Sequence, residues 1–408
     1  MSHPVKTELI TRPGPDPHTE IAQLRQRCPV HPIDFPAGSQ AYLVVDHETA
    51  VRAFNDPRLS KDINNAPDWF RDQAVDNSAV LSSNMMGADP PEHTRLRKLV
   101  GRAFLPRPME RLRPRIQQIT DDLIDAFPAS GELDLLTAFA FPLPLMVICE
   151  FLGIRYQDRA LFQRWGNVLS QDPGRETEAE TRARRLANDE VDDYLTEVLA
   201  ERRAEPRDDF IGDLVKLADA EDGYTDAELV STIIFLIIAG HKTTANLIGN
   251  GTEALLRHPD QLALLRAEPG LVDSAVEEFL RYEGSVDRAT VRFAAQDLSL
   301  AGVDIPRGSF VHLSVQAAGH DPAMFTDPER LDITRSPNRH MAFGHGAHFC
   351  AGAPLARLEG QVAFATLLRR LPELSLAVPV EELEWVADSS ISRGLVSLPV
   401  RMADKRPR

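Results

Sequence analysis

Cysteine is scarce in this chain, and the three that occur, Cys28, Cys149 and Cys350, lie far apart among 408 residues. Cysteines so few and so scattered exclude a disulfide framework and are typical of a reducing compartment. Long apolar runs are also lacking, since no segment reaches the roughly 20 residues that span a bilayer. The start of the chain, MSHPVKTELITRPGPDP, has neither the basic nor the apolar region of a signal peptide. We therefore expect a cytoplasmic protein without a membrane span.

The chain also has fewer basic than acidic residues. The chain has 45 Lys and Arg against 61 Asp and Glu, a net charge of −16 that argues against nucleic acid as a partner. Flexible linkers, low-complexity tracts and internal repeats are lacking too, and 43% hydrophobic residues suffice for a large core. We expect one domain over residues 1–408, with an irregular segment over 1–20.

Apolar residues at helical spacing dominate, and strand patterns are short, so the predicted fold is mainly α with small β-sheets. A strand is expected over 41–45, a helix over 48–54, and a hairpin over 298–315 that turns at Pro306-Arg307-Gly308. Residues 60–92, rich in Asp, Asn, Ser and Pro, predict a long irregular loop. Further helices are predicted over 91–104, 109–127, 142–152, 158–170, 176–203, 226–257, 260–267, 271–282 and 354–371.

The segment 226–257 predicts a long central helix. Thr225 and Glu228 form a capping box at its start. The following LVSTIIFLIIA is apolar on every side, which indicates a buried helix. Gly240-His-Lys-Thr-Thr244 then interrupts the apolar pattern, which resumes at Ala245. We interpret this break as a functional kink, because a threonine hydroxyl can take over a backbone acceptor.

The most unusual segment is FGHGAHFCAG, residues 343–352. Cys350 is either a small apolar filler or a thiolate ligand. The glycines allow close backbone approach to a bulky partner, and the helix expected from Pro354 lowers the pKa of a nearby thiol. Zinc is a rival, because His340, His345, His348 and Cys350 fall within eleven residues. Structural zinc sites prefer paired cysteines, however, whereas haem iron needs a single cysteinate.

Two other helices carry polar pairs that mean little alone. Glu278 and Arg281 stand three residues apart on one predicted helix face, where a surface ion pair is the ordinary interpretation. His93 and Arg97 stand four apart and present two donors on one side, which is most often a solvated basic face.

Together, in this order, these motifs resemble the cytochrome P-450 family of haem-thiolate monooxygenases. The resemblance rests on the His93/Arg97 helix, on Ala239-Gly240-x-x-Thr243-Thr244, on Glu278-x-x-Arg281 and on the Cys350 segment. FGHGAHFCAGAPLARLE and HPDQLALLR are similar to the soluble bacterial branch, especially actinobacterial enzymes that tailor natural products.

The resemblance implies a haem b cofactor and a role for each motif. Cys350 would be the axial ligand, and Phe343 would shield its sulfur. Glu278 and Arg281 would be buried and structural. The remaining cofactor-binding residues would hold the haem propionates (His93, Arg97, Arg292 and His348), let the backbone pass the porphyrin (Gly346 and Gly352) or line the oxygen side with Thr243 (Ala239 and Gly240).

One position departs from the family pattern. Lys242 stands where an acid usually precedes the threonine and relays protons. Thr243 and Lys242 are therefore the candidate catalytic residues. A lysine ammonium cannot accept a proton, and burying it unpaired is costly, so we expect Lys242 to turn from the iron toward an acid.

The implied activity is insertion of one atom of dioxygen into a C–H bond or alkene of a lipophilic, polyketide- or macrolide-like product, as in antibiotic biosynthesis. Electrons would come from NAD(P)H through a ferredoxin reductase and a ferredoxin that docks near Arg97, Arg102, Arg107, Arg111, Arg113 and Arg357. We expect a monomer. Two alternatives stay open: a haem-thiolate isomerisation, dehydration or oxidative coupling, and a haem- or zinc-binding protein that is no enzyme. The expected substrate contacts are Met85, Met86, Phe235, Ile238, Ala239, Val286, Ala289 and Ile391.

Overall fold

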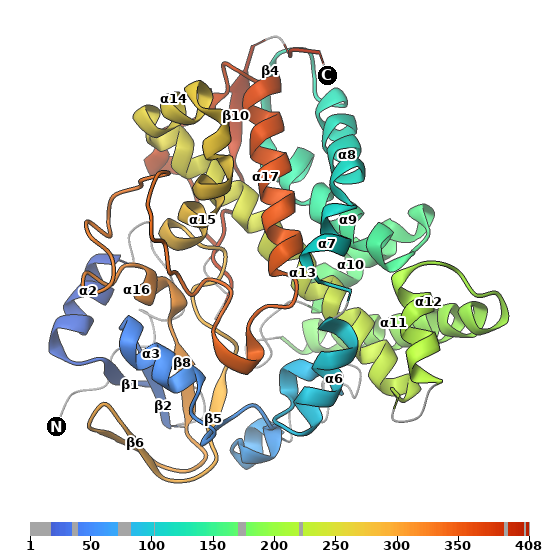
Figure 1. Cartoon of the computed structure of the whole chain (residues 1–408), viewed down its shortest axis with the longest axis vertical. Helices are drawn as coiled ribbons and strands as arrows, with labels where there is room; N and C mark the ends of the chain where they lie inside the picture. Colours follow the sequence, from blue (N-terminus) through green and yellow to red (C-terminus); the bar gives the residue numbers. More distant parts are fainter. Residues whose placement is uncertain are drawn as a thin grey trace.

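The computed structural model describes residues 18–34, 40–71, 83–101, 103–169, 177–219, 223–386, 391–403 and 405–407. Helices fill the upper and right part of the molecule in Figure 1, and the main sheet lies at the lower left with the N-terminal helices. The fold is mainly α with small sheets, as predicted. Its helices are α2 (His18–Arg27), α3 (His47–Phe54), α6 (Glu92–Gly101), α7 (Pro106–Glu110), α8 (Arg113–Asp125), α9 (Pro142–Leu152), α10 (Arg159–Leu169), α11 (Glu178–Ala204), α12 (Phe210–Ala218), α13 (Asp226–Arg257), α14 (Pro259–Ala267), α15 (Val272–Tyr282), α16 (Val315–Gly319) and α17 (Ala353–Arg370).

The largest sheet has five strands, in the order β1-β2-β8-β5-β3. β2 pairs in parallel with β8, with Ala41 opposite Phe310, and the other neighbours in this sheet are antiparallel. A three-stranded sheet has the order β4-β10-β9, and β6 pairs with β7 alone. The strands are β1 (Val30–Asp34), β2 (Gln40–Val44), β3 (Leu59–Ser60), β4 (Gly131–Asp134), β5 (Arg292–Ala294), β6 (Leu298–Leu300), β7 (Val303–Ile305), β8 (Phe310–Leu313), β9 (Ser375–Leu376) and β10 (Pro399–Met402).

A hairpin forms within residues 298–315, but the predicted position of its turn is wrong. The chain reverses at Ala301 and Gly302, whose φ angles of 49° and 81° suit a tight two-residue hairpin turn. The Pro306-Arg307-Gly308 segment instead carries the chain from β7 into the five-stranded sheet. The alternating pattern identified the strands but not their partners, because periodicity does not record which edge pairs with which.

Several predicted boundaries also shift. The helix expected over 91–104 ends at Gly101, and the one expected from 109 to 127 is divided into α7 and α8, each with a proline in its first turn. Residues 18–20 open α2, so the irregular N-terminal segment does not extend to residue 20. Within the loop expected over 60–92, β3 ends at Ser60 and two short 3₁₀ turns occur, Ile63–Asn65 and Met85–Gly87, whereas 72–82 lie outside the described residues.

The long helix α13 occupies the middle of the molecule, where α17 crosses it in Figure 1. Its capping box is formed as predicted, with Thr225 and Glu228 each bonding the other's backbone N–H. Leu229, Ile233 and Ile237 are buried, and each such side chain stabilises the fold by about 1.5–3 kcal/mol. α13 packs against α9 and α17. It alone among the described helices is long and apolar enough to cross a bilayer, but 67% of that apolar window is buried inside the protein.

An ion pair inside the protein braces the segment that leads to the Cys350 loop. The Glu278 carboxylate accepts two 2.8 Å hydrogen bonds from Arg281, and both side chains are fully buried. Arg335 and Asn338 donate to the same carboxylate. Arg281 also donates to the carbonyls of Gly319 and Pro328. Because every part of this pair is hydrogen-bonded, removing one partner leaves a buried charge, at a cost of about 3–5 kcal/mol.

Candidate active site: a cavity between α13 and the Cys350 loop

A cavity of about 1370 Å³, part of it open to solvent, separates α13 from the Cys350 loop. The loop and the start of α17 supply Phe343, Gly344 and the residues from Cys350 to Gly352 on one side. On the other side, α13 presents one face, which runs from Phe235 to Leu247. A flat partner between these two walls would meet a thiol on one face and a helix backbone with small side chains on the other.

The Cys350 loop is shaped by its glycines and by one short hydrogen bond. Gly344 and Gly346 have φ angles of 72° and 73°, a conformation that favours glycine. The Cys350 backbone N–H donates to the Phe343 carbonyl at 2.8 Å. Cys350 is an exposed residue that lines the cavity, and the protein atoms around its sulfur desolvate the thiol.

The pKa of the Cys350 thiol differs from the sequence-based expectation. Burial raises this pKa, and the backbone N–H groups of Gly352 and Ala353 with the charges of Arg97 and Arg357 oppose that effect only in part. The expectation of a lowered pKa was wrong because desolvation outweighs the helix terminus. A bound metal cation reverses this balance, since a coordinating thiol is deprotonated outright.

Basic side chains from three parts of the chain meet at one edge of the cavity. The rings of His93 and His348 lie 4.1 Å apart, and the Arg292 guanidinium lies 4.7 Å from the Phe54 ring. Arg97 donates to the Phe349 carbonyl at 2.5 Å. Sequence reasoning missed Lys61, a buried amine that donates to the carbonyls of Thr290 and Val291, and no motif marked it.

The positive charge of each of these groups makes protonation of its neighbours less favourable. Burial, and then the nearby His93, Lys61, Arg292 and Arg97, lower the pKa of His348 to about 3. Burial lowers the pKa of Arg292 to about 10, although the carboxylate of Asp89 opposes it. Burial and Arg97 also lower the pKa of His93. An edge with two arginines, two imidazole donors and one nearby carboxylate matches a ligand with two carboxylates, so the residues present fit the propionates of haem.

Zinc at this loop does not fit the geometry. His340 bonds to Glu277 at 3.0 Å and accepts from the Ala342 backbone, and the His348 ring is tilted by 40° against the His93 ring. Across the described part of the chain, the only cluster of three or more His, Cys, Asp or Glu close enough to hold a metal ion lies elsewhere. All three cysteines are free, as predicted.

The face of α13 toward the cavity includes Ala239, Gly240, Thr243 and Thr244. The Thr243 hydroxyl donates to the Ala239 carbonyl at 2.6 Å, the type of contact expected at this break in the apolar pattern, although the helix is continuous over 226–257. Lys242 is half-buried and is absent from the cavity wall. Its charge instead contributes to lowering the pKa of the buried His241 imidazole, after the larger effect of burial.

Most predicted contact residues line the cavity, and four do not, Lys242 among them. Ile238 does not line the cavity, because it lies about 100° around α13 from Ala239 and about 140° from Thr243, outside the lining face. Ile391 is partly exposed, and its carbonyl accepts from the Asp287 backbone. A Cβ on Gly346 would lie 2.8 Å from Asn55, so this glycine lets the loop pass α3, while Gly344 lines the cavity. The predicted residues that do line it are Met85, Met86, His93, Arg97, Phe235, Ala239, Gly240, Thr243, Val286, Ala289, Arg292, Phe343, His348, Cys350 and Gly352.

Comparison with known proteins identifies the family of this chain. The family model described as Cytochrome P450 matches residues 35–375. The chain is 45% identical to the cytochrome P450 monooxygenase PikC of Streptomyces venezuelae, over 95% of this chain and 91% of the relative. It is 43% identical to the vitamin D(3) 25-hydroxylase of Pseudonocardia autotrophica, over 96% and 94%. The solved structure of CxnD, a P450 described as forming a C–S bond in chuangxinmycin biosynthesis, superposes with a TM-score of 0.96 at 54% identity, covering 100% of this chain and 99% of that one.

Sequence reasoning also missed Glu359, the only acidic residue among the described residues that line the cavity. It lies one helical turn beyond Leu355 on α17, and this i,i+4 spacing was the available signal. The side chain is buried, and its Oε2 atom has no hydrogen-bond partner within the described structure. Burial raises the pKa of Glu359 well above its ordinary value, so the folded protein favours the neutral acid.

We predict that Glu359→Gln stabilises the protein relative to wild type, and that this gain in unfolding free energy is larger at high pH than at low pH. The unfolded chain releases the Glu359 proton near pH 4.5, whereas the folded protein holds it to higher pH, so wild-type stability falls as pH rises through that interval. The gain in unfolding free energy should grow by up to about 1.4 kcal/mol per pH unit above 4.5. Urea unfolding of the haem-loaded proteins at several pH values measures this, with the exposed Glu132→Gln as control. A difference independent of pH would contradict the neutral-acid assignment.

Proposed function

The chain belongs to the cytochrome P450 family, whose cofactor is haem iron, and is an oxidoreductase of the monooxygenase type; we propose that it uses haem b to insert one atom of dioxygen into a C–H bond or alkene of a polyketide- or macrolide-like natural product. The observation that carries the proposal is one cavity with Cys350 on one wall, Thr243 on the other and a basic edge between them. We further propose that the protein is a cytoplasmic monomer; its three free cysteines are typical of a reducing compartment.

In this proposal each group has a defined task. Arg97 and Arg292 pair with the haem propionates, while His93 and His348 donate hydrogen bonds to them. Cys350 supplies the sulfur ligand. When bound, the haem activates dioxygen for transfer of an oxygen atom to the substrate. The Arg357 guanidinium lies 4.5 Å from the Phe343 ring and is held by Glu277, which fixes the wall beside the sulfur.

Proton delivery is assigned to Thr243. The Thr243 hydroxyl donates its hydrogen to the Ala239 carbonyl. The lone pairs of its oxygen can therefore accept a hydrogen bond from a donor in the cavity. Lys242 has no lone pair when charged and stands off the cavity wall, so ordered water takes the place of the acid that the family usually has.

A lipophilic substrate is supported by the lining on the α13 side. Phe235, Leu247, Val286 and the two methionines of the turn at 85–87 are among its apolar lining residues, and methionine adapts to irregular ligands. The names of the relatives support hydroxylation chemistry, and PikC is named a monooxygenase.

Oxidative coupling is the second candidate, favoured by the 54% identity to CxnD, which is described as forming a C–S bond. The Lys242 departure is compatible with it, because coupling places no oxygen atom in the product. Turnover under ¹⁸O-labelled dioxygen separates the two candidates: the label enters the product of a monooxygenase, whereas coupling leaves it in water.

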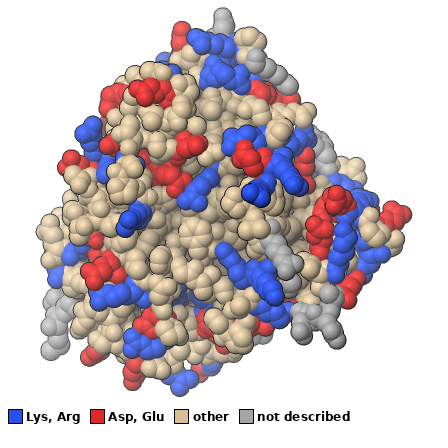
Figure 2. Space-filling model, in the orientation of Figure 1, with Lys and Arg blue, Asp and Glu red and all other residues tan. Residues whose placement is uncertain are grey.

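A ferredoxin partner is proposed to dock where α6, α7 and the start of α17 reach the surface. Figure 2 shows Lys and Arg side chains gathered over α6 and α7 on this face. Of the expected docking arginines, Arg113 and Arg357 pair with acids, Arg97 is bound to the loop backbone, and Arg102 lies outside the described residues. Arg107 and Arg111 are exposed and remain the basic contacts for an acidic partner.

We predict that Cys350→Ala abolishes oxygenase activity and the red-shifted Soret band of the ferrous carbon monoxide complex. No other described residue of the cavity supplies an anionic sulfur. Cys28→Ala and Cys149→Ala serve as matched controls and should keep both properties. A thiolate-type spectrum that survives in the Cys350 variant would overturn the proposed function.

We predict that Thr243→Ala diverts most of the reducing power into hydrogen peroxide. A positioned proton-transfer group contributes about 10²-fold or more, so product formed per NADPH should fall steeply, whereas Lys242→Ala should change this ratio little. Lys242→Glu should keep or raise turnover. The measurement is NADPH, peroxide and product in one assay. Loss of turnover in Lys242→Ala with a mild Thr243→Ala would make the lysine the proton donor instead.

We predict that electron transfer from an acidic ferredoxin slows as salt rises. Opposite charges accelerate encounter and are screened within about 10 Å at 0.1 M salt. Arg107→Ala combined with Arg111→Ala should reduce the low-salt rate several-fold and flatten its salt dependence. Arg307→Ala, an exposed arginine in the β7–β8 connection, is the control. If the stopped-flow reduction rate changes neither with salt concentration nor with the double substitution, this docking face is refuted.

A further inference from the structure

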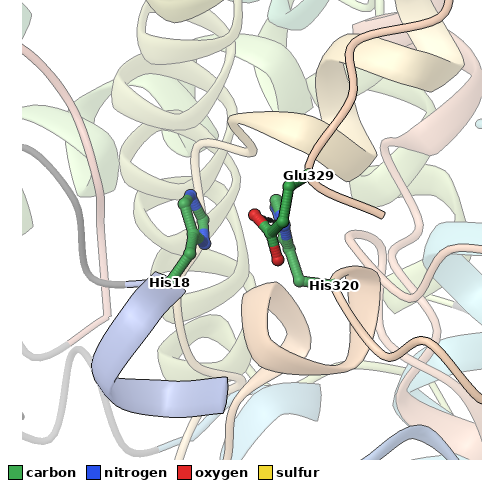
Figure 3. A group of neighbouring side chains, drawn as sticks. All are labelled: His18, His320 and Glu329. Atoms are coloured by element: carbon green, nitrogen blue, oxygen red, sulfur yellow. Dashed lines mark hydrogen bonds and ion pairs between the residues drawn. The ribbon is translucent and has the colours of Figure 1, made fainter. Parts of the chain in front are cut away.

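Three metal-ligating side chains from separate segments meet on the side of the protein that carries α2 and α16, outside the cavity. His18 is the first residue of α2, His320 caps the end of α16, and Glu329 follows in the segment that leads to the Cys350 loop. One donor atom from each lies within 4.8 Å of the other two. Figure 3 shows the His18 ring directed from α2 toward His320 and Glu329.

The hydrogen bonds of His320 decide which of its nitrogens is available. Its Nε2 lies 2.9 Å from the Tyr282 carbonyl oxygen, which has no proton to give, so Nε2 carries the hydrogen. The Gln316 amide nitrogen, 3.3 Å from the same Nε2, donates to the Tyr282 carbonyl at 2.7 Å. Its Nδ1 then faces the Glu329 carboxylate at 2.9 Å. A neutral imidazole in this state directs a lone pair at an anion, and that contact is favourable only with a cation between them. The occupant is therefore either a proton or a metal ion.

The His320 arrangement is the one that metal-binding histidines use, because they usually donate the second ring N–H to a backbone carbonyl or carboxylate. Arg25 fixes the neighbouring elements by donating to the carbonyls of His320 and Ala317 at 2.9 and 2.6 Å. This contact ties α2 to the end of α16 and holds His18 beside His320, with ring centroids 3.8 Å apart.

The ligand chemistry of the cluster suits a metal as well. Metal-bound histidines are neutral, so two imidazoles and one carboxylate would give the bound site a ligand charge of −1. The Glu329 side chain is 55% exposed, which leaves an entry path for an ion and its water.

We propose that His18, His320 and Glu329 form a binding site for a divalent transition-metal cation, with zinc as the best match, that ties α2 to the segment preceding the Cys350 loop. Two histidines, one glutamate and a water make up a four-coordinate zinc set. The stacked rings direct their lone pairs side by side, so the His18 ring turns out of the stack when the ion binds. That rotation is available because His18 is only partly buried, at the first position of its helix.

The test is equilibrium dialysis of the chelator-treated, haem-loaded full chain against zinc, with zinc and iron counted by elemental analysis. We expect one zinc per haem in the wild type and at least a tenfold loss of affinity in His18→Phe and in Glu329→Gln. His18→Phe keeps a flat ring against His320 but has no ligand nitrogen, which separates ligation from packing. His47→Ala, a histidine outside the cluster, is the control and should bind as wild type.

Thermal unfolding gives a second measurement on the same proteins. Zinc should raise the melting temperature of the wild type and of His47→Ala, because a ligand that binds only the folded state stabilises it, and should leave His18→Phe unchanged. Less than one tenth of a zinc per haem in the wild type would show that a proton holds His320 and Glu329 together. Equal zinc binding by wild type and His18→Phe would place the ion elsewhere. Either result overturns the proposal.

Discussion

The fold is organised around an unbalanced set of basic groups at the edge of its cavity. His93, Arg97, Arg292 and His348 come from α6, β5 and the Cys350 loop, and burial lowers the pKa of each. Buried cations are costly unless they are paired, so an anionic partner would stabilise this edge. A dicarboxylate such as haem satisfies the two arginines and leaves the neutral imidazoles as donors. Haem held at this edge would have the Cys350 loop on one side and α13 on the other.

The two walls are held by different means. α13 is fixed by apolar burial along its whole length, so its cavity face can include small and polar residues such as Gly240 and Thr243 without loss of the helix. The Cys350 loop has little regular structure and depends on hydrogen bonds instead. Glu278 and Arg281 hold the segment before it, and the Arg357–Glu277 pair holds the Phe343 ring. Packing therefore positions the oxygen side, whereas buried polar networks position the sulfur side.

The sequence was sufficient for features with a local cause and insufficient for those that depend on distant partners. The capping box of α13, its burial and the free cysteines followed from spacing and composition. The motif order identified Cys350 and the basic edge. Lys61 and Glu359 were missed because their burial depends on segments far away in the chain. The thiol pKa had the wrong sign because desolvation is a property of the folded environment. Ile238 was expected at the cavity, but the helical phase shared by Ala239, Thr243 and Leu247 leaves it outside the lining face.

The central claim is that the basic edge requires the two carboxylates of the cofactor. It is tested most directly by measuring how tightly the haem-free protein binds haem and haem dimethyl ester, in which both propionates are neutral. Hydrogen bonds to charged groups contribute about 1.5–3 kcal/mol each. Since 1.4 kcal/mol is a factor of ten, losing two of them should weaken the ester by about 10²-fold or more. Equal affinities for haem and its ester would contradict the account.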